Sequence, residues 1–153
     1  MMVPVEVKIL DDRLLSEFGA PVYATQGSAG LDLRACLDAE VTLNPGEQLL
    51  VSTGIAIHLK NKNLVGMLYP RSGLGVKHGI VLANGTGVID SDYQGEIKAC
   101  LRNNGDKPFV LKPGERIAQY VVLPTFQLAM TVVDEFDSST ERGEGGFGST
   151  GTE

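Results

Sequence analysis

The segment "LDLRACL", residues 31–37, alternates apolar and polar side chains along its whole length. Its odd-numbered positions are leucine or alanine, and its even-numbered positions are aspartate, arginine and cysteine. Because successive side chains of a strand point to opposite faces, a period of two separates the apolar set from the polar set. The segment therefore predicts a β-strand with one buried face and with Asp32 and Arg34 on its polar face.

Similar short runs fill most of the chain on both sides of this strand. Turn signals such as Asn84-Gly85 and Lys112-Pro113-Gly114 separate them at a spacing of roughly eight to twelve residues. The runs that resemble strands are "VEVKIL", "QLLVSTGIAIHL", "LVGMLYP", "GIVLA", "EIKACLR", "FVLK", "RIAQYVVLP" and "LAMTVV". The best helix candidate is short, over residues 72–78. The sequence therefore predicts an all-β sandwich, jelly roll or barrel.

The length of 153 residues predicts one domain, with a β-barrel body over residues 1–134. From about Asp134 the apolar pattern stops, and residues 135–153 are expected to form a mobile C-terminal arm. The arm contains "RGEGGFGST", residues 142–150, which fits the G-x-G-x-x-G pattern of dinucleotide-binding proteins. That pattern requires a strand before it and a helix after it, and neither is indicated here, so dinucleotide binding is rejected.

Composition excludes several classes of function. The net charge of −6 makes the chain a poor general binder of nucleic acid. Cys36 and Cys100 are far apart and predict two reduced thiols. Since no signal peptide and no long apolar run is visible, we expect a cytoplasmic protein that does not engage a membrane.

The stretch "YPRSGLGVKHG", residues 69–79, is a candidate phosphate site. Arg71 and Ser72 are expected at the start of the short helix, where a guanidinium, a hydroxyl and free backbone N–H groups would converge. An ordinary capped turn explains the same residues equally well.

The stretch "NGTGVIDSDYQGE", residues 84–96, predicts a β-hairpin with "GVI" and "YQGEIKACL" as its arms. Asp90 and Asp92 would lie near its tip. Asp90 follows the apolar pair Val88-Ile89, which would partly desolvate its carboxylate and suit it to general-base catalysis. The alternative is a turn aspartate that bonds its own backbone.

Five segments occur in a fixed order along residues 28–150: "SAGLDLRA", "PRSGLG", "GVIDSDYQGE", "PGERIAQ" and "RGEGGFGST". Together they resemble the five motifs of the trimeric deoxyuridine triphosphate nucleotidohydrolases, the dUTPases. The resemblance implies a distorted jelly-roll β-barrel with one short helix, and a homotrimer whose active sites are built from more than one chain. It also implies hydrolysis of dUTP to dUMP and pyrophosphate with Mg²⁺, which would limit uracil incorporation into DNA and supply dUMP for thymidylate synthesis.

The resemblance also implies roles for the residues that bind the triphosphate. Asp90 would be the general base for a water that attacks the α-phosphorus in line with the leaving pyrophosphate. Asp32 would contact Mg²⁺ through water, while the triphosphate oxygens hold the ion. The phosphates would be cradled by Arg71, Ser72, Gly73 and Gln119.

Recognition of the base and sugar is implied for the predicted hairpin. Asn84 would offer its amide to the uracil edge, and backbone groups near Val88, Ile89 and Lys98 would complete the pairing. Tyr93 would pack against the deoxyribose and leave no room for a 2′-hydroxyl group, which would reject UTP.

The resemblance implies that the arm is a lid, in which Arg142 grips the γ-phosphate and Phe147 stacks on uracil. A deoxycytidine triphosphate deaminase is the nearest rival, since it shares the fold and the triphosphate site. That branch carries a glutamate where this chain aligns Cys100. A catalytically silent binding protein is a further alternative, although Asp90 and Phe147 are both present.

Overall fold

The computed structural model describes residues 2–146 of the chain. Its two helices are α1, Arg13–Ser16, and α2, Ser72–His78. Its strands are β1 Glu6–Ile9, β2 Leu31–Arg34, β3 Val41–Leu43, β4 Gln48–Ser52, β5 Ile55–His58, β6 Leu64–Pro70, β7 Ile80–Leu82, β8 Gly87–Ile89, β9 Lys98–Asn103, β10 Phe109–Leu111 and β11 Arg116–Pro124. The predicted all-β fold is confirmed.

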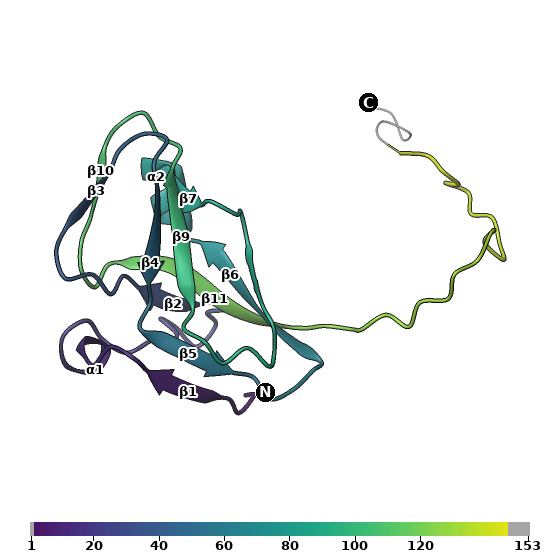
Figure 1. Ribbon diagram of the computed structural model, residues 1–153, viewed down its shortest axis with the longest axis horizontal. Helices are drawn as coiled ribbons and strands as arrows, with labels where there is room; N and C mark the ends of the chain where they lie inside the picture. Colours follow the sequence, from purple (N-terminus) through teal and green to yellow (C-terminus); the bar gives the residue numbers. More distant parts are fainter. Residues whose placement is uncertain (1, 147–153) are drawn as a thin grey trace.

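The strands form two larger sheets and two short ribbons, all antiparallel. One sheet has the order β2-β11-β6-β8 and the other β4-β9-β7, while β1 pairs with β5 and β3 pairs with β10. Figure 1 shows β4 and β9 running steeply across the direction of β11 and β2. One hydrophobic core is enclosed by these strands, and its fully buried members include Leu33, Val51, Ile55, Leu101, Leu111 and Ile117. This arrangement is that of a distorted jelly roll.

The strand predicted from "LDLRACL", β2, has one buried face and one polar face, as expected. Leu33 and Ala35 are 0% exposed, whereas Asp32 and Arg34 are only partly buried. β2 lies at the edge of its sheet and pairs with β11, in which Gln119 is opposite Asp32. The strand therefore brings Asp32 next to the "PGERIAQ" segment, which is far away in the sequence.

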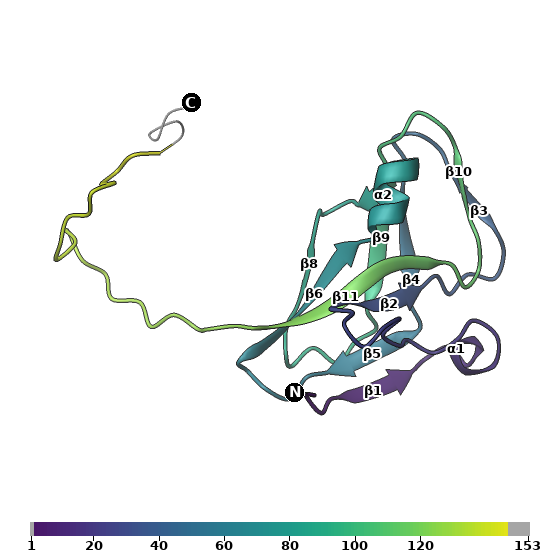
Figure 2. The same ribbon diagram turned by 180° about the vertical axis from the view of Figure 1, so that it is seen from behind.

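The predicted helix has the predicted bounds. It follows β6 directly and ends at Gly79, whose φ of 71° is in the left-handed region that favours glycine. A side chain at Gly79 would also collide with the backbone of Gly105, 2.5 Å away. Figure 2 shows α2 beyond the end of β6, with β8 and β11 on either side of that strand.

Two of the predicted strands differ from the structure. The run "QLLVSTGIAIHL" forms β4 and β5, because the chain bends at Gly54, whose φ is 69°. The run "LAMTVV" forms no strand, because no described segment pairs with residues 128–133. The last strand ends at Pro124, and the described residues beyond it lead away from the body in Figure 1. The predicted boundary between residues 134 and 135 stays a prediction.

The predicted hairpin is wrong in its pairing. β8 pairs with β6, with Ile89 opposite Gly66, whereas β9 pairs with β4 and β7. The two expected arms belong to different sheets and diverge after Ile89, because the period of two in each arm is satisfied by a more distant strand. Their divergence opens a cavity between them.

Both cysteines are free thiols, as predicted. Burial, together with the neighbouring Asp11 carboxylate, raises the pKa of the Cys36 thiol to about 12. Cys36 therefore stays protonated and unreactive near neutral pH. In the described part of the chain, neither helix has the length and hydropathy needed to cross a membrane.

Candidate active site

One cavity of about 330 Å³ brings together the residues predicted to bind phosphate and metal. It lies where β2, β11 and the junction between β6 and α2 meet. Its lining consists of Ala24, Ser28, Ala29, Gly30, Asp32, Arg71, Ser72, Gly73 and Gln119. Three segments that are widely separated in the sequence thus converge, because β11 pairs with β2 on one side and with β6 on the other.

Two arginines hold the Asp32 carboxylate in this cavity. Arg71 Nε donates to Asp32 Oδ1 at 2.9 Å, and Arg116 Nη1 donates to Asp32 Oδ2 at 3.1 Å. The side chain of Asp32 is only 20% exposed, so these charge-assisted bonds are partly shielded from water. Two cations against one anion leave a net positive charge, which suits a polyphosphate ligand.

Arg116 is a site residue that the sequence reasoning missed. It opens β11 three residues before Gln119 and reaches the far side of the Asp32 carboxylate. Arg71 Nη1 also approaches the Arg116 carbonyl oxygen, at 3.4 Å. The signal was present in "PGERIAQ", where the arginine follows the turn that starts the strand.

The amide of Gln119 is fixed between two neighbours in this cavity. Its Nε2 donates to the Pro70 carbonyl oxygen at 3.0 Å. On its other side, a methyl group on Gly30 would lie 2.5 Å from Oε1 and 3.1 Å from Cβ of Gln119. The glycine is therefore required for this position of the amide, which keeps its second N–H available to a ligand.

A second cavity, of about 430 Å³, lies where β8 and β9 diverge. Its walls are formed by Val88, Ile89, Asp90, Tyr93, Glu96, Ile97 and Lys98. Five of these seven residues are predicted site residues: the predicted base Asp90 and four of the five residues assigned to the uracil and sugar. The cavity is partly apolar, with one carboxylate near each end of the connecting loop.

Asp90 follows β8 directly and is exposed to solvent at the edge of this cavity. The Tyr93 backbone N–H donates to the Asp90 carbonyl oxygen at 3.1 Å, which closes the turn through the main chain. Within residues 2–146, the Asp90 carboxylate itself has no hydrogen bond or ion pair. The turn is therefore stable without the Asp90 side chain, and its carboxylate is left for a ligand or a water molecule.

The remaining predicted residues lie outside both cavities. Asn84 is exposed, and its Nδ2 donates to the Thr86 carbonyl oxygen at 3.2 Å. Arg142 is exposed on the arm, where its Nε donates to the Gly145 carbonyl oxygen at 2.9 Å. Phe147 lies outside the described residues.

The two cavities have no lining residue in common. A cationic cradle and a partly apolar cavity beside a free carboxylate, on one jelly-roll body, are the features expected of a protein that handles a phosphorylated small molecule with a ring. A family model described as dUTPase matches residues 16–151. The chain therefore belongs to the dUTPase family.

Relatives and solved structures agree with this assignment. A deoxyuridine 5′-triphosphate nucleotidohydrolase of Tolumonas auensis is 58% identical over 150 residues, which cover 98% of this chain and 99% of the relative. The protein of the same name from Neisseria meningitidis serogroup C is 60% identical over 152 residues, with 99% of each chain covered.

Two phage proteins have similar structures. The dUTPase of Staphylococcus bacteriophage 80alpha, solved with dUPNHPP, has a TM-score of 0.81 and 29% identity, with 98% and 99% of the two chains covered. A dUTPase mutant from phage phi11 of S. aureus, whose structure reveals the coordination of a structural Mg(II) ion, has a TM-score of 0.75 and 23% identity, with 88% and 99% covered.

Proposed function

We propose that this chain hydrolyses dUTP to dUMP and pyrophosphate. The observation that carries the proposal is the combination of the arginine-lined cavity around Asp32 with the cavity that ends at the free Asp90 carboxylate. Membership of the dUTPase family supports the choice of substrate. The reaction would remove dUTP before uracil enters DNA and supply dUMP for thymidylate synthesis.

Asp90 acts in this proposal as the general base. Its carboxylate accepts a proton from the water that attacks the α-phosphorus, and pyrophosphate leaves on the opposite side. An exposed carboxylate without a partner in the described residues is free to accept that proton. The position of Asp90 after the hydrophobic strand β8 directs it towards the edge of the cavity.

The phosphates are held by Arg71, Ser72, Gly73 and Gln119 in this proposal. All four line one cavity, and Arg71 is held there by its bond to Asp32. Donors that are already oriented stabilise developing negative charge without a cost of reorganisation during the reaction. Arg116 forms an ion pair with the same Asp32 carboxylate and so adds a second positive charge beside the phosphates.

Mg²⁺ is the proposed cofactor, and the residues present fit it as a partner held through water. Within residues 2–146 no group of three histidine, cysteine, aspartate or glutamate residues could hold a metal ion. Mg²⁺ is commonly bound by one or two carboxylates together with substrate phosphates and waters, and Asp32 is the carboxylate in the phosphate cavity. When bound, the ion would neutralise charge on the triphosphate.

Uracil and deoxyribose are assigned to the other cavity. Backbone groups of Val88, Ile89 and Lys98 pair with the base, and the ring of Tyr93 covers the sugar and excludes a 2′-hydroxyl group. Asn84 lies on the turn that leads into β8, and its single bond to Thr86 leaves one N–H and the amide oxygen for the base edge.

The proposed assembly is a homotrimer with shared active sites. Two cavities without a common residue support a site that is completed by a neighbouring chain. The segment after β11 supports it as well, since its side chains Phe126, Leu128, Met130 and Val132 are 83–96% exposed on a single chain. Arg142 and Phe147 would then close over a bound nucleotide. A cytoplasmic location stays a prediction from the sequence.

The decisive experiment measures pyrophosphate release from dUTP, dCTP, dTTP and UTP, with and without Mg²⁺. Of the four nucleotides, we expect only dUTP to release pyrophosphate, and we expect Mg²⁺ to increase that release. Asp90→Asn should abolish turnover while a non-hydrolysable dUTP analogue still binds. A near-normal kcat in this variant would rule out Asp90 as the base.

The same assay separates the rival deaminase, which would release ammonia from dCTP. Cys100 does not line the base cavity, and the only glutamate that does, Glu96, has its carboxylate bonded to the backbone N–H of Gly54. A carboxylate fixed in this way is poorly placed to transfer protons at a base. Release of ammonia from dCTP would refute the proposed hydrolase function and would identify the chain as a deaminase.

A further inference from the structure

We propose that Glu96 is a positioning residue, which sets the ring of Tyr93 and thereby the discrimination between dUTP and UTP. The inference rests on the proposed function, because Tyr93 is assigned there to the sugar. It concerns a residue that lines the base cavity from the loop between β8 and β9 and that has no assigned role in the reaction.

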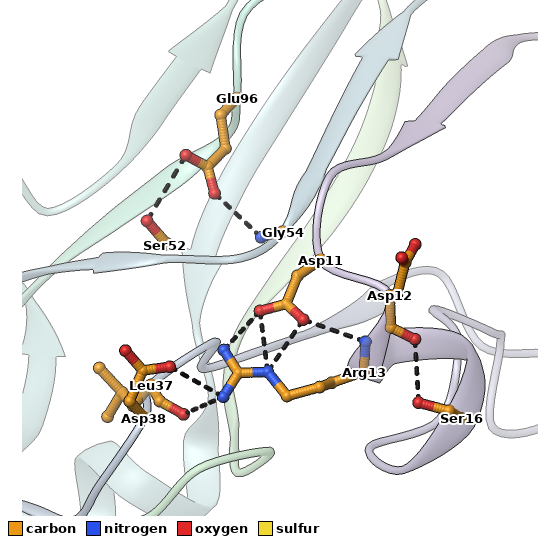
Figure 3. Close-up of polar contacts among 9 residues, drawn as sticks. All are labelled: Asp11, Asp12, Arg13, Ser16, Leu37, Asp38, Ser52, Gly54 and Glu96. Carbon is orange, nitrogen blue, oxygen red and sulfur yellow. Dashed lines mark hydrogen bonds and ion pairs between the residues drawn. The ribbon is translucent and has the colours of Figure 1, made fainter.

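The carboxylate of Glu96 links this loop to the bend between β4 and β5. Glu96 Oε1 accepts from the Gly54 backbone N–H at 3.1 Å, and Ser52 Oγ donates to Oε2 over a longer 3.5 Å. Figure 3 shows both contacts, with Glu96 reaching from the loop that precedes β9 to the bend. Lys98 Nζ lies 3.6 Å from Oε2, so a positive charge lies beside the carboxylate.

The donor at Gly54 is itself held firmly. Its φ of 69° is in the left-handed region, and a side chain there would lie 2.7 Å from Cys36 Sγ and 2.8 Å from Asp11 Cβ. The Gly54 carbonyl oxygen accepts from the Leu10 backbone N–H at 2.7 Å. Gly54 is thus held by close packing and by a bond from its carbonyl oxygen, and Glu96 is bonded to a residue with little freedom to move.

The next residue is attached to the same bend. The Ile97 backbone N–H donates to the Ile55 carbonyl oxygen at 2.9 Å, and the buried Thr53 hydroxyl donates to the Ile97 carbonyl oxygen. The segment of Glu96 and Ile97 is therefore held by backbone bonds and by the glutamate side chain. Only the side-chain bond can be removed by substitution without changing a core residue.

The ring of Tyr93 rests on this anchored segment. Its hydroxyl donates to the Glu96 carbonyl oxygen at 3.0 Å. A side chain on Gly95 would lie 2.6 Å from Tyr93 Cζ, so the ring lies directly on the Gly95 backbone. A change in the Glu96 peptide would thus move the hydroxyl end of the ring, which faces the cavity assigned to the sugar.

The test compares Glu96→Ala and Glu96→Gln with the wild-type chain. An amide oxygen in Glu96→Gln can still accept from Gly54, whereas Glu96→Ala leaves that N–H without its partner. We expect Glu96→Ala to lower the ratio of kcat/KM for dUTP to that for UTP about tenfold, as the loss of one bond to a charged acceptor would. The change should appear mainly in KM, and Glu96→Gln should recover most of it.

Glu47→Ala is the matched control. Glu47 Oε2 also accepts from a turn backbone N–H, that of Asn44 at 2.7 Å, but Glu47 lines neither cavity. The Glu47→Ala variant should lose stability without a change in the ratio of kcat/KM for dUTP to that for UTP. An unchanged ratio in Glu96→Ala would make Glu96 merely structural and would overturn the proposal.

Hydrogen exchange of the Gly54 amide tests the anchor without any turnover. The amide should be protected in the wild-type chain and in Glu96→Gln, and should exchange at least about tenfold faster in Glu96→Ala. Equal protection in all three would also overturn the proposal. A wild-type chain that shows the expected exchange but releases no pyrophosphate from dUTP would refute the proposed function and, with it, the assigned role in discrimination, while leaving the anchor itself established.

Discussion

Adding one methyl group at Gly30 should damage the phosphate cavity, whereas the same change at Gly27 should not. At Gly30 the methyl would lie 2.5 Å from Oε1, 3.1 Å from Cβ and 3.3 Å from Cδ of Gln119. At Gly27 it would meet nothing within 4 Å. Neither glycine has a φ in the left-handed region, so packing alone separates the two variants.

The expected magnitude follows from these contacts. Gly30→Ala must displace the Gln119 amide and break its bond to Pro70, which costs about 1 kcal/mol, in addition to about 1–3 kcal/mol for overpacking. For a chain of this size the melting temperature should fall by roughly 5–10 °C. Loss of an oriented donor to a charged phosphate should lower kcat/KM for dUTP by about 10- to 100-fold.

Thermal melting and pyrophosphate release, measured on Gly30→Ala and Gly27→Ala together, provide the assay. A second substitution, Gln119→Ala, identifies the cause. In the double variant the Oε1 and Cδ atoms are gone, so most of the stability lost in Gly30→Ala should return while activity stays low. Equal stability and activity of the two glycine variants would refute the reasoning.

Three further outcomes are expected. Tyr120→Phe should raise the free energy of unfolding by about 1 kcal/mol, since the Tyr120 hydroxyl is buried without a partner within residues 2–146; a loss of stability in chemical denaturation would contradict this. The hydrogen bond from Arg13 holds the pKa of Asp11 at about 2, below its usual 3.8, so this contact stabilises the fold above about pH 4 and is lost as the pH falls towards 2. Asp11→Asn should therefore melt lower at neutral pH and lose less stability across that acidic window, and parallel melting curves would refute the assignment. Deleting residues 138–153 should cut dUTP turnover severely while the trimer stays folded in sedimentation, and full activity would refute the lid.

Local patterns in the sequence were sufficient for the strands that carry the phosphate cavity. β6 and β11 have the bounds of the runs "LVGMLYP" and "RIAQYVVLP", because turn residues flank both and their apolar positions face the core. α2 was predicted as a short helix that follows Pro70, and in the structure Gly79 caps its end. Alternation specifies which face of a strand is buried.

Alternation does not specify which strand lies alongside. The arms of the predicted hairpin are neighbours in the sequence, yet β8 pairs with β6 and β9 with β4 and β7. The same limit explains the missed side chains. Arg116 meets Asp32 across 84 positions and Glu96 meets Gly54 across 42, and no local spacing reports such contacts.

The segment after β11 also shows that alternation alone does not identify the strand that lies alongside. Phe126, Leu128, Met130 and Val132 alternate with Gln127, Ala129 and Thr131 as in a strand with one apolar face. The apolar side chains are nevertheless exposed, because the described chain provides no strand beside them. A period of two that a single chain leaves unsatisfied is expected where the partner belongs to another chain. The prediction of a strand at "LAMTVV" is therefore wrong for the isolated chain, and the same pattern supports the proposed trimer, in which a neighbour would supply the missing surface and bring the lid to a site assembled from both chains.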